Sequence, residues 1–129
     1  MDKKEFIAAL EELGWPKEEY VILSGGSLLL RGLRETTADV DLSMTKRLAR
    51  EINLYDAPQD EKGYYSPREE VQVLDDFEGT EFDIVDGYQC ESLESILELK
   101  RRLMRPKDLK DIEKIEEALK RKEPHGGNI

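Results

Sequence analysis

The sequence predicts an α/β fold of the α+β type, in which helices flank a small mixed β-sheet. Stretches with apolar residues at helical spacing alternate along the chain with short apolar runs that are typical of strands, and the sequence has no internal repeat. A length of 129 residues is enough for one hydrophobic core and too short for two. We therefore expect one domain over residues 1–129, with residues 122–129 as a flexible tail.

The first third of the chain predicts helix, strand, helix and strand in turn. Apolar side chains recur at helical spacing up to Gly14, which together with Pro16 ends the first helix. The apolar run at residues 20–24 predicts a buried strand, and residues 27–33 predict the first turns of a second helix. Residues 39–42 alternate between acidic and apolar side chains and predict a second strand.

The rest of the chain predicts a long loop, a pair of strands and a helical end. Residues 45–52 predict a third helix, and the polar stretch 53–69, which contains prolines and a glycine, predicts the loop. The runs 71–74 and 81–85 predict two strands that a turn joins into an antiparallel pair. The remainder is expected to be helical, with a break at Pro106.

The composition limits the location and the partners of the protein. A net charge of −10 argues against an extended nucleic-acid surface. No segment approaches the ~20 apolar residues of a membrane span, and no secretory signal pattern is present. The single cysteine, Cys90, cannot form an internal disulfide and indicates a reducing, cytoplasmic location. The only histidine, His125, lies in the expected tail, so we expect no histidine base and no histidine-built zinc site.

A glycine turn, Ser24-Gly25-Gly26-Ser27, separates the first predicted strand from the second predicted helix. Glycine permits positive φ and lets the backbone approach a ligand closely. The free N–H groups and the positive dipole end of the new helix favour an anion, and Ser27 adds a hydroxyl. A phosphate group is the ligand that suits this arrangement.

Two carboxylates follow in the segment Asp39-Val40-Asp41-Leu42. The period of two in a strand turns Asp39 and Asp41 to one face, while the apolar pair faces a core. Because neighbouring carboxylates repel, a hard cation such as Mg²⁺ stabilises them, and it usually takes waters and substrate phosphates as its other ligands. Each motif alone occurs by chance in an acidic chain, so their order and spacing carry the interpretation.

In this order and spacing the two motifs resemble those of the nucleotidyltransferase superfamily with the polymerase-β-like fold, particularly its small single-domain members. In that pattern a glycine turn opens a helix, and an Asp-x-Asp sequence follows on a strand. Residues 23–27 match the glycine turn, and residues 39–42 match the Asp-x-Asp sequence. A third carboxylate lies on a later strand, for which Phe82-Asp83-Ile84 has the expected form. The chain end is similar to abortive-infection and antibiotic nucleotidyltransferase-like proteins, in which a Lys precedes an Arg-x-Lys-Asp-x-x-Asp run. Here these are Lys100 and residues 105–111.

The resemblance implies a Mg-dependent enzyme that transfers a nucleoside monophosphate from a nucleoside triphosphate, such as ATP, to a hydroxyl of an unidentified acceptor. Asp39, Asp41 and Asp83 would be its catalytic residues and would hold two Mg²⁺ ions, with Asp83 helping as base. A second set of residues would contact the triphosphate. These are Gly25, Gly26, Ser27, Arg34 and Lys100.

Lys100 has a competing structural explanation. It lies in the apolar stripe of the helix expected over residues 93–104, and Asp108 lies in the apolar stripe of the next helix. A buried charge is rarely tolerated unpaired, so a Lys100–Asp108 ion pair is favoured over a Lys100 that binds triphosphate. Arg31, like Arg34, flanks the end of the second helix and is a further candidate for phosphate contact.

Other side chains compete for roles in the site. Asp83 is preferred as third carboxylate because it alternates with Phe82 and Ile84. Its competitors are Asp75, Asp76 and Asp86. Three tyrosines of the long loop could stack on a base or an acceptor, although packing over the loop is the simpler explanation for them. They are Tyr55, Tyr64 and Tyr65.

A chain this short has little material to surround an acceptor, so we expect a homodimer partner or a second protein to complete the site. The main alternative is a non-catalytic nucleotidyltransferase-fold binding or regulatory protein of a toxin–antitoxin or phage-defence pair. Convergence of all three carboxylates would distinguish the enzyme from this alternative. A metal-dependent glycosyltransferase with Asp-x-Asp is disfavoured, because the chain is too short for the usual nucleotide-sugar domain.

Overall fold

The structure is a computed structural model that describes residues 1–122. The chain divides into two compact units, Met1–Glu91 and Ser92–Ile129, and the single domain expected from the sequence stays a prediction. The predicted tail, with His125 in it, falls outside the described residues from position 123 on. The α+β class is confirmed, because the described residues form helices and a six-stranded mixed sheet.

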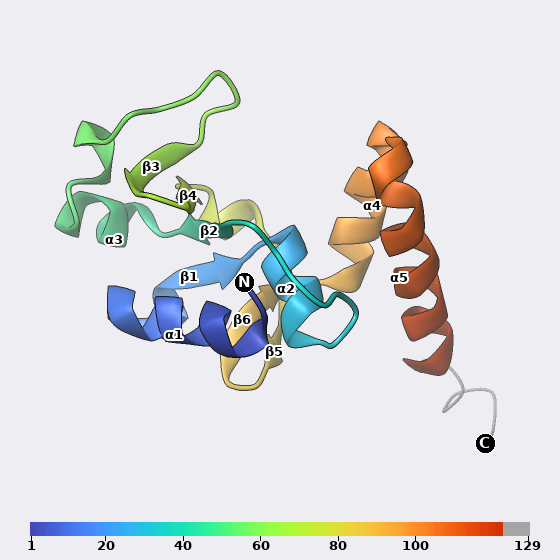
Figure 1. The fold of residues 1–129 in the computed structure, drawn as a ribbon. Coiled ribbons are helices and arrows are strands. Elements are labelled where there is room, and N and C mark those ends of the chain that lie inside the picture. The colour runs from blue at the N-terminus through green and yellow to red at the C-terminus, as the bar shows by residue number, and fades with distance from the viewer. Residues whose placement is uncertain (123–129) are drawn as a thin grey trace. The chain divides into compact units, whose positions relative to one another are not determined.

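The first unit is built on six strands, which are β1 (Tyr20–Ile22), β2 (Val40–Met44), β3 (Tyr65–Arg68), β4 (Val71–Leu74), β5 (Phe82–Val85) and β6 (Tyr88–Glu91). They form one sheet in the order β3-β4-β2-β1-β6-β5 (Figure 1). The central strands β1 and β2 are antiparallel, β6 runs parallel to β1, and β4 runs parallel to β2. The outer strands β3 and β5 are antiparallel to their neighbours.

The helices of this unit are α1 (Lys3–Leu13), α2 (Ser24–Leu30) and α3 (Lys46–Glu51), and its 3₁₀ turns are η1 (Lys17–Glu19), η2 (Leu54–Asp56) and η3 (Phe77–Gly79). Helix α1 begins with a capping box, in which Asp2 accepts from the Glu5 N–H and Glu5 accepts from the Asp2 N–H. It ends at Gly14, which has the left-handed conformation that glycine favours. The predicted end of this helix is therefore confirmed.

The three helices share one hydrophobic core with one face of the sheet. Phe6 of α1, Leu29 of α2 and Leu48 of α3 are almost fully buried in a cluster with Ile22 and Leu42 of the central strands. Burial of such side chains contributes on the order of 1.5–3 kcal/mol each. We call the face of the sheet that bears Ile22 and Leu42 the core face.

The strand register assigns the other side chains to a face. Ile22 pairs with Leu42 and with Cys90, and paired residues direct their side chains to the same side. Cys90 therefore also lies on the core face. Successive residues of a strand alternate, so Asp41 and Glu91, which adjoin Leu42 and Cys90, lie on the opposite face. We call this second side of the sheet the acidic face.

The second unit contains α4 (Leu93–Leu103), η4 (Pro106–Asp108) and α5 (Leu109–Lys122). Ser92 caps α4 by accepting from the Ser95 N–H, and Met104 ends the helix in a left-handed conformation. The predicted break at Pro106 is confirmed, since it begins the 3₁₀ turn between the helices. Along residues 1–122, every helix is too short or too polar to cross a membrane.

The strand pairing in the second half of the first unit differs from the prediction. The expected hairpin of residues 71–74 and 81–85 is wrong, because β4 lies between β3 and β2 while β5 pairs with β6. The predicted loop 53–69 contains η2 and β3. The sequence prediction does not include strand β6, although Asp86-Gly87 before it is a strong hairpin signal. Both residues have positive φ, 53° and 83°, as two-residue hairpin turns require.

Candidate nucleotide and metal site

The glycine turn opens α2 directly after β1, as the sequence predicts. Leu23 is the extended N-cap residue, and no side chain caps the helix in the usual way. The Ser24 N–H instead donates to Glu91 Oε1 over 2.9 Å. A carboxylate at this position is favourable because the N-terminal end of a helix carries partial positive charge. Part of the expected anion-binding capacity is therefore used by the protein itself.

Gly25 lies against the loop that follows α2. A Cβ atom at Gly25 would stand 2.6 Å from Nη1 of Arg34 and 2.9 Å from Oγ1 of Thr37. Because both distances are too short for a real contact, only glycine lets these two side chains approach the turn. The structure thus brings Arg34 to the glycine turn, where the sequence predicts a phosphate contact.

Gly26 and Ser27 face the interior. A Cβ atom at Gly26 would overlap the ring of Phe6 and stand 2.7 Å from Cγ2 of Ile22, so packing of the core explains this glycine. The Ser27 hydroxyl is fully buried, donates to the Glu91 carbonyl over 2.8 Å and accepts from Arg31. These contacts differ from the expected contacts of both residues with phosphate.

The two sequence motifs lie next to each other. The Leu23 N–H, immediately before the glycine turn, donates to the Asp41 carbonyl over 2.9 Å. Asp39 precedes β2 and Asp41 lies within it, and both are half-buried. The structure therefore places the residue before the glycine turn beside the strand that carries Asp41.

Asp41 has an unusual environment for a carboxylate. Its Oδ1 atom is buried, and no hydrogen-bond partner for it is found within the described residues. Burial, followed by the nearby charge of Asp39, raises the pKa of the Asp41 carboxyl from 3.8 to about 6. A buried acceptor without a partner costs free energy, and a bound cation would supply the missing interaction.

Asp83 does not join this pair. It lies on the edge strand β5, which β6 and β1 separate from β2. It pairs with Cys90 and so lies on the core face, where its Oδ2 is 3.0 Å from Nη2 of Arg31 at the end of α2. The expectation that Asp39, Asp41 and Asp83 converge is wrong. The alternation around Asp83 predicts a strand, but only the pairing with β6 determines its face.

The competing carboxylates do not replace Asp83. Asp75 Oδ2 accepts from the Tyr55 hydroxyl over 2.8 Å and from Lys46 over 3.3 Å, and Asp86 forms an ion pair with Lys3. Within residues 1–122, no three or more His, Cys, Asp or Glu side chains come together as a metal-binding group. A cation at Asp39 and Asp41 would therefore need waters or ligand phosphates to complete its coordination.

Glu91 is a carboxylate of the site that the sequence prediction did not include. It is 9% exposed and lies on the acidic face with Asp41. Burial, followed by the charges of Asp41 and Glu91, raises the pKa of Tyr64 in the predicted loop. Recognition of the Asp86-Gly87 turn would have revealed β6 and, through its alternation, the face on which Glu91 lies.

The strand beside Asp41 carries an amide at the matching position. Gln72 of β4 pairs with Asp41 of β2, so both side chains lie on the acidic face. An amide can offer an oxygen to a cation, but it adds no negative charge. The neighbouring strand therefore supplies no third carboxylate at this level of the sheet.

In the second unit, Lys100 belongs to a buried ionic cluster. Its Nζ atom lies 3.1 Å from Asp108 Oδ1 and 3.3 Å from Asp111 Oδ2, and Lys100 is only 5% exposed. Arg105 Nε lies 2.7 Å from Asp108 Oδ2. Arg105 and, more weakly, Lys100 lower the pKa of Asp108 to about 2 against the opposing effect of burial. The predicted Lys100–Asp108 pair is confirmed, and these contacts favour its structural role over triphosphate binding.

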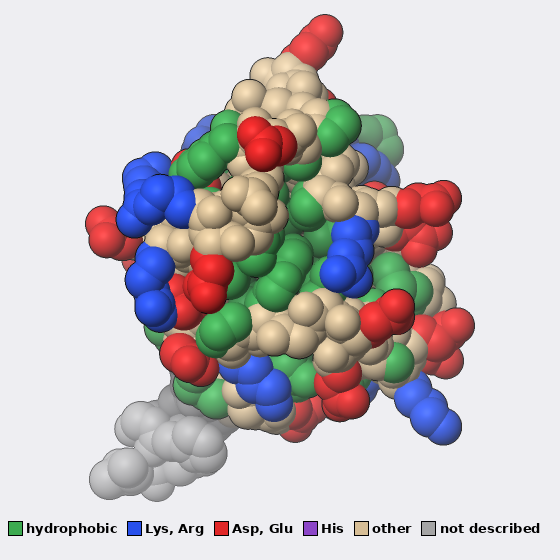
Figure 2. All heavy atoms as spheres, turned by 90° about the vertical axis from the view of Figure 1, so that its left-hand side faces the viewer, with side chains coloured by type: hydrophobic (Ala, Val, Ile, Leu, Met, Phe, Trp, Pro, Cys, Tyr) green, Lys and Arg blue, Asp and Glu red, His purple; other side chains and the backbone are tan. Residues whose placement is uncertain are grey.

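The surface around the first unit has mixed charge. Figure 2 shows one face, on which Lys and Arg side chains are interspersed with Asp and Glu around exposed hydrophobic groups.

Comparisons with models of known protein families, with curated proteins and with solved structures find no match to this chain. The functional interpretation therefore depends on the geometry of the chain's own residues.

Proposed function

We propose that the chain binds a nucleoside triphosphate through a divalent cation, such as Mg²⁺, at Asp39 and Asp41. In this proposal it is a nucleotidyltransferase-like binding protein that lacks the complete catalytic set. The observation that carries the proposal is the buried Oδ1 atom of Asp41, for which residues 1–122 offer no hydrogen-bond partner. Two carboxylates of like charge and a desolvated oxygen are the features that a hard cation stabilises.

The surroundings of the carboxylate pair suit a phosphate ligand. The Asp41 strand is hydrogen-bonded to Leu23, directly before the glycine turn, and Arg34 lies against Gly25 in that turn. A triphosphate that shared a cation with Asp41 would thus have a guanidinium group in the same neighbourhood. Arginine pairs well with phosphate because its planar N–H donors match the phosphate oxygens.

The position of Asp83 supports binding over transfer. With Asp83 on the core face, the site lacks the third carboxylate that the resemblance assigns as base. A nucleotide-binding protein without that group could serve as the regulatory member of a toxin–antitoxin or phage-defence pair. The bound nucleotide would then act as a signal instead of a substrate.

Nucleotide transfer is the second candidate, and the placement of Glu91 favours it. Glu91 lies on the same face as Asp41, with only β1 between their strands. If the chain transfers a nucleotide to a hydroxyl acceptor, Glu91 would take the role that the resemblance gives to Asp83. A second copy or another protein would then complete the walls around the acceptor.

The proposal is tested by titrating each labelled nucleoside triphosphate into the protein with MgCl₂ or with EDTA. We expect binding that requires Mg²⁺ and is lost in Asp39→Asn and Asp41→Asn, while circular dichroism shows both variants folded. Asp83→Asn is the matched control and should bind like wild type, because Asp83 faces the other side of the sheet. Wild-type affinity in Asp41→Asn would refute the cation site.

A transfer assay separates the two candidates. Each labelled nucleoside triphosphate is incubated with pooled RNA, protein and small-molecule hydroxyl acceptors in MgCl₂. Binding without label transfer supports the binding protein. Label transfer that Glu91→Gln abolishes, with nucleotide binding retained, supports the enzyme. The amide of Gln can still accept from the Ser24 N–H, so this substitution preserves the start of α2.

A further inference from the structure

The two edges of the sheet differ in how they are protected. Edge strand β3 contains Pro67 and has an irregular register between Tyr65 and Arg68, and both features discourage the addition of another strand. Edge strand β5 has no proline and pairs regularly with β6 over its four residues. Its outer backbone groups, unlike those of β3, are therefore suited to accept a further strand.

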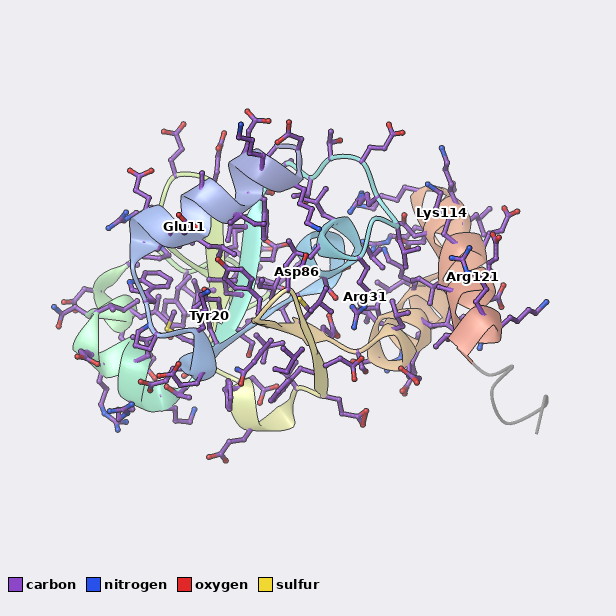
Figure 3. The ribbon with its side chains drawn as sticks, turned by 90° about the horizontal axis from the view of Figure 1, so that it is seen from below. Glu11, Tyr20, Arg31, Asp86, Lys114 and Arg121 are labelled. Carbon is purple, nitrogen blue, oxygen red and sulfur yellow. The ribbon has the colours of Figure 1, made fainter. Side chains whose placement is uncertain are left out.

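Apolar side chains accompany the open edge of β5. Phe82 is 38% exposed and Ile84 is 62% exposed, and the period of two places both on the same side of the strand. The ring of Phe77 in η3 lies 6.1 Å from that of Phe82. Figure 3 shows the short helix η3 (yellow) at the lower rim of the first unit, from which the chain runs on toward Asp86. An exposed apolar row on an unprotected edge is a feature that monomeric proteins avoid unless a partner covers it.

The surroundings of β5 are acidic. Residues 69–91 contain nine Asp or Glu residues and no Lys, Arg or His. Three of the nine form ion pairs with basic residues of other segments. Asp76, Glu78 and Glu81 take part in no ion pair within the described residues and are exposed. These three flank the start of β5, so a partner strand would meet uncompensated negative charge there.

This charge decides between two possible occupants. A second copy that paired its own β5 with this strand would bring two acidic segments together, and like charges opposite each other are destabilising. A partner segment with Lys or Arg would instead be attracted by the negative charge around β5. The acidic edge thus disfavours self-association through β5 and favours a partner with Lys or Arg.

We propose that β5 is a docking edge for an extended segment of another protein, which adds a strand to the sheet. Its backbone pairs with β5, its alternate apolar side chains contact Phe82 and Ile84, and its Lys or Arg residues lie near Glu78 and Glu81. Main-chain hydrogen bonds would supply affinity, and the apolar and basic positions would supply specificity. This inference does not rest on the proposed binding of a nucleotide, although Phe82 pairs with Glu91.

The test uses the whole chain and a displayed library of random short peptides. We expect the enriched peptides to have apolar residues at every second position and Lys or Arg residues beside them. Ile84→Lys should lower the affinity for a selected peptide by about tenfold or more, as expected for a residue at the centre of an interface. Leu109→Lys is the matched control, since Leu109 is a similarly exposed apolar residue, and it should leave affinity unchanged. Hydrogen exchange should slow at the amides of β5 when the peptide binds.

A charge reversal gives a second, independent readout. Glu81→Lys should lower the affinity for the peptide and reduce the salt dependence of its binding. Glu35→Lys, also at an exposed position, should change neither the affinity nor the salt dependence. Failure to enrich any peptide, or equal affinity for wild type and Ile84→Lys, would overturn the proposal. A wild-type dimer in solution that Ile84→Lys dissociates would also overturn it, because the occupant would then be a second copy.

Discussion

Asp41 links protonation to cation binding. Its carboxyl has a pKa raised to about 6, so at neutral pH it is ionised and ready to bind a cation. Below that pH a proton occupies the carboxyl and competes with the metal. We predict that Mg²⁺ affinity, measured by calorimetric titration, is constant above pH 7 and falls by about tenfold per pH unit well below 6. A constant affinity down to pH 5 would show that Asp41 is not a ligand.

The same raised pKa predicts how the metal-free protein responds to pH. Between 3.8 and about 6 the folded state holds a proton on Asp41 that the unfolded state has released, so the unfolding free energy falls as pH rises through this range. Asp41→Asn removes the buried charge and should therefore raise the melting temperature at pH 7.5. The gain should vanish near pH 4, where Asp41 is protonated anyway. Equal gains at both pH values would contradict the assigned environment.

The two adjacent glycines should respond differently to the same substitution. Gly26→Ala places a methyl group against Phe6 in the core, and such overpacking costs about 1–3 kcal/mol of unfolding free energy. Gly25→Ala meets the far end of Arg34, a flexible side chain that can move, so its effect on stability should be smaller. Its effect should appear as weaker nucleoside triphosphate binding. Thermal melts and nucleotide titrations of both variants test the distinction.

These glycines also mark what residue identity alone can predict. The motif correctly predicts that a helix opens directly after a strand, although the helix begins at Ser24 and thus includes both glycines. Its order with Asp39 and Asp41 is consistent with the hydrogen bond between Leu23 and Asp41. It does not reveal that Phe6, distant in sequence, lies behind Gly26 whereas Arg34 lies beside Gly25. The sequence therefore overestimates how many residues of the turn are free to bind phosphate.

At the level of elements, local patterns were reliable and strand pairing was not. The end of the first helix at Gly14 and the break at Pro106 depend on nearby residues, and the sequence predicts both. The pairing of β4 with β2, and of β5 with β6, depends on which strands share a core, which local alternation does not specify. The error at Asp83 follows from that pairing, since its register with Cys90 determines its face.

The Lys100 cluster predicts a stability effect that nucleotide binding does not share. Lys100→Ala leaves Asp111 without its counter-charge, whereas Arg105 still holds Asp108. We therefore expect a loss of about 3 kcal/mol in unfolding free energy, the lower end of the range for broken buried pairs. Chemical denaturation measures this loss. Nucleoside triphosphate affinity of the folded variant should remain at the wild-type value.

A double variant supplies the control for that prediction. Lys100→Met with Asp111→Leu removes both buried charges and keeps the Arg105–Asp108 pair, so it should recover much of the lost stability. A fully stable Lys100→Ala protein with weakened nucleotide binding would contradict the structural role. It would instead support the contact with triphosphate that the resemblance implies.

At the scale of the whole molecule, the net charge of −10 opposes folding through self-repulsion. Added NaCl should therefore raise the melting temperature by screening. MgCl₂ at the same ionic strength should raise it further if Asp39 and Asp41 bind the ion. The extra stability amounts to about 1.4 kcal/mol at a tenfold excess of free Mg²⁺ over its Kd.

Two variants separate specific binding from general screening. Asp41→Asn should keep the response to NaCl and lose the excess response to MgCl₂, because it removes one ligand and only one unit of the total charge. Asp83→Asn removes the same charge from the other face of the sheet and should keep both responses. If Asp41→Asn and Asp83→Asn respond alike to MgCl₂, the ion acts on the acidic surface as a whole. The cation site at Asp39 and Asp41 would then be refuted, while the effect of net charge on stability would stand.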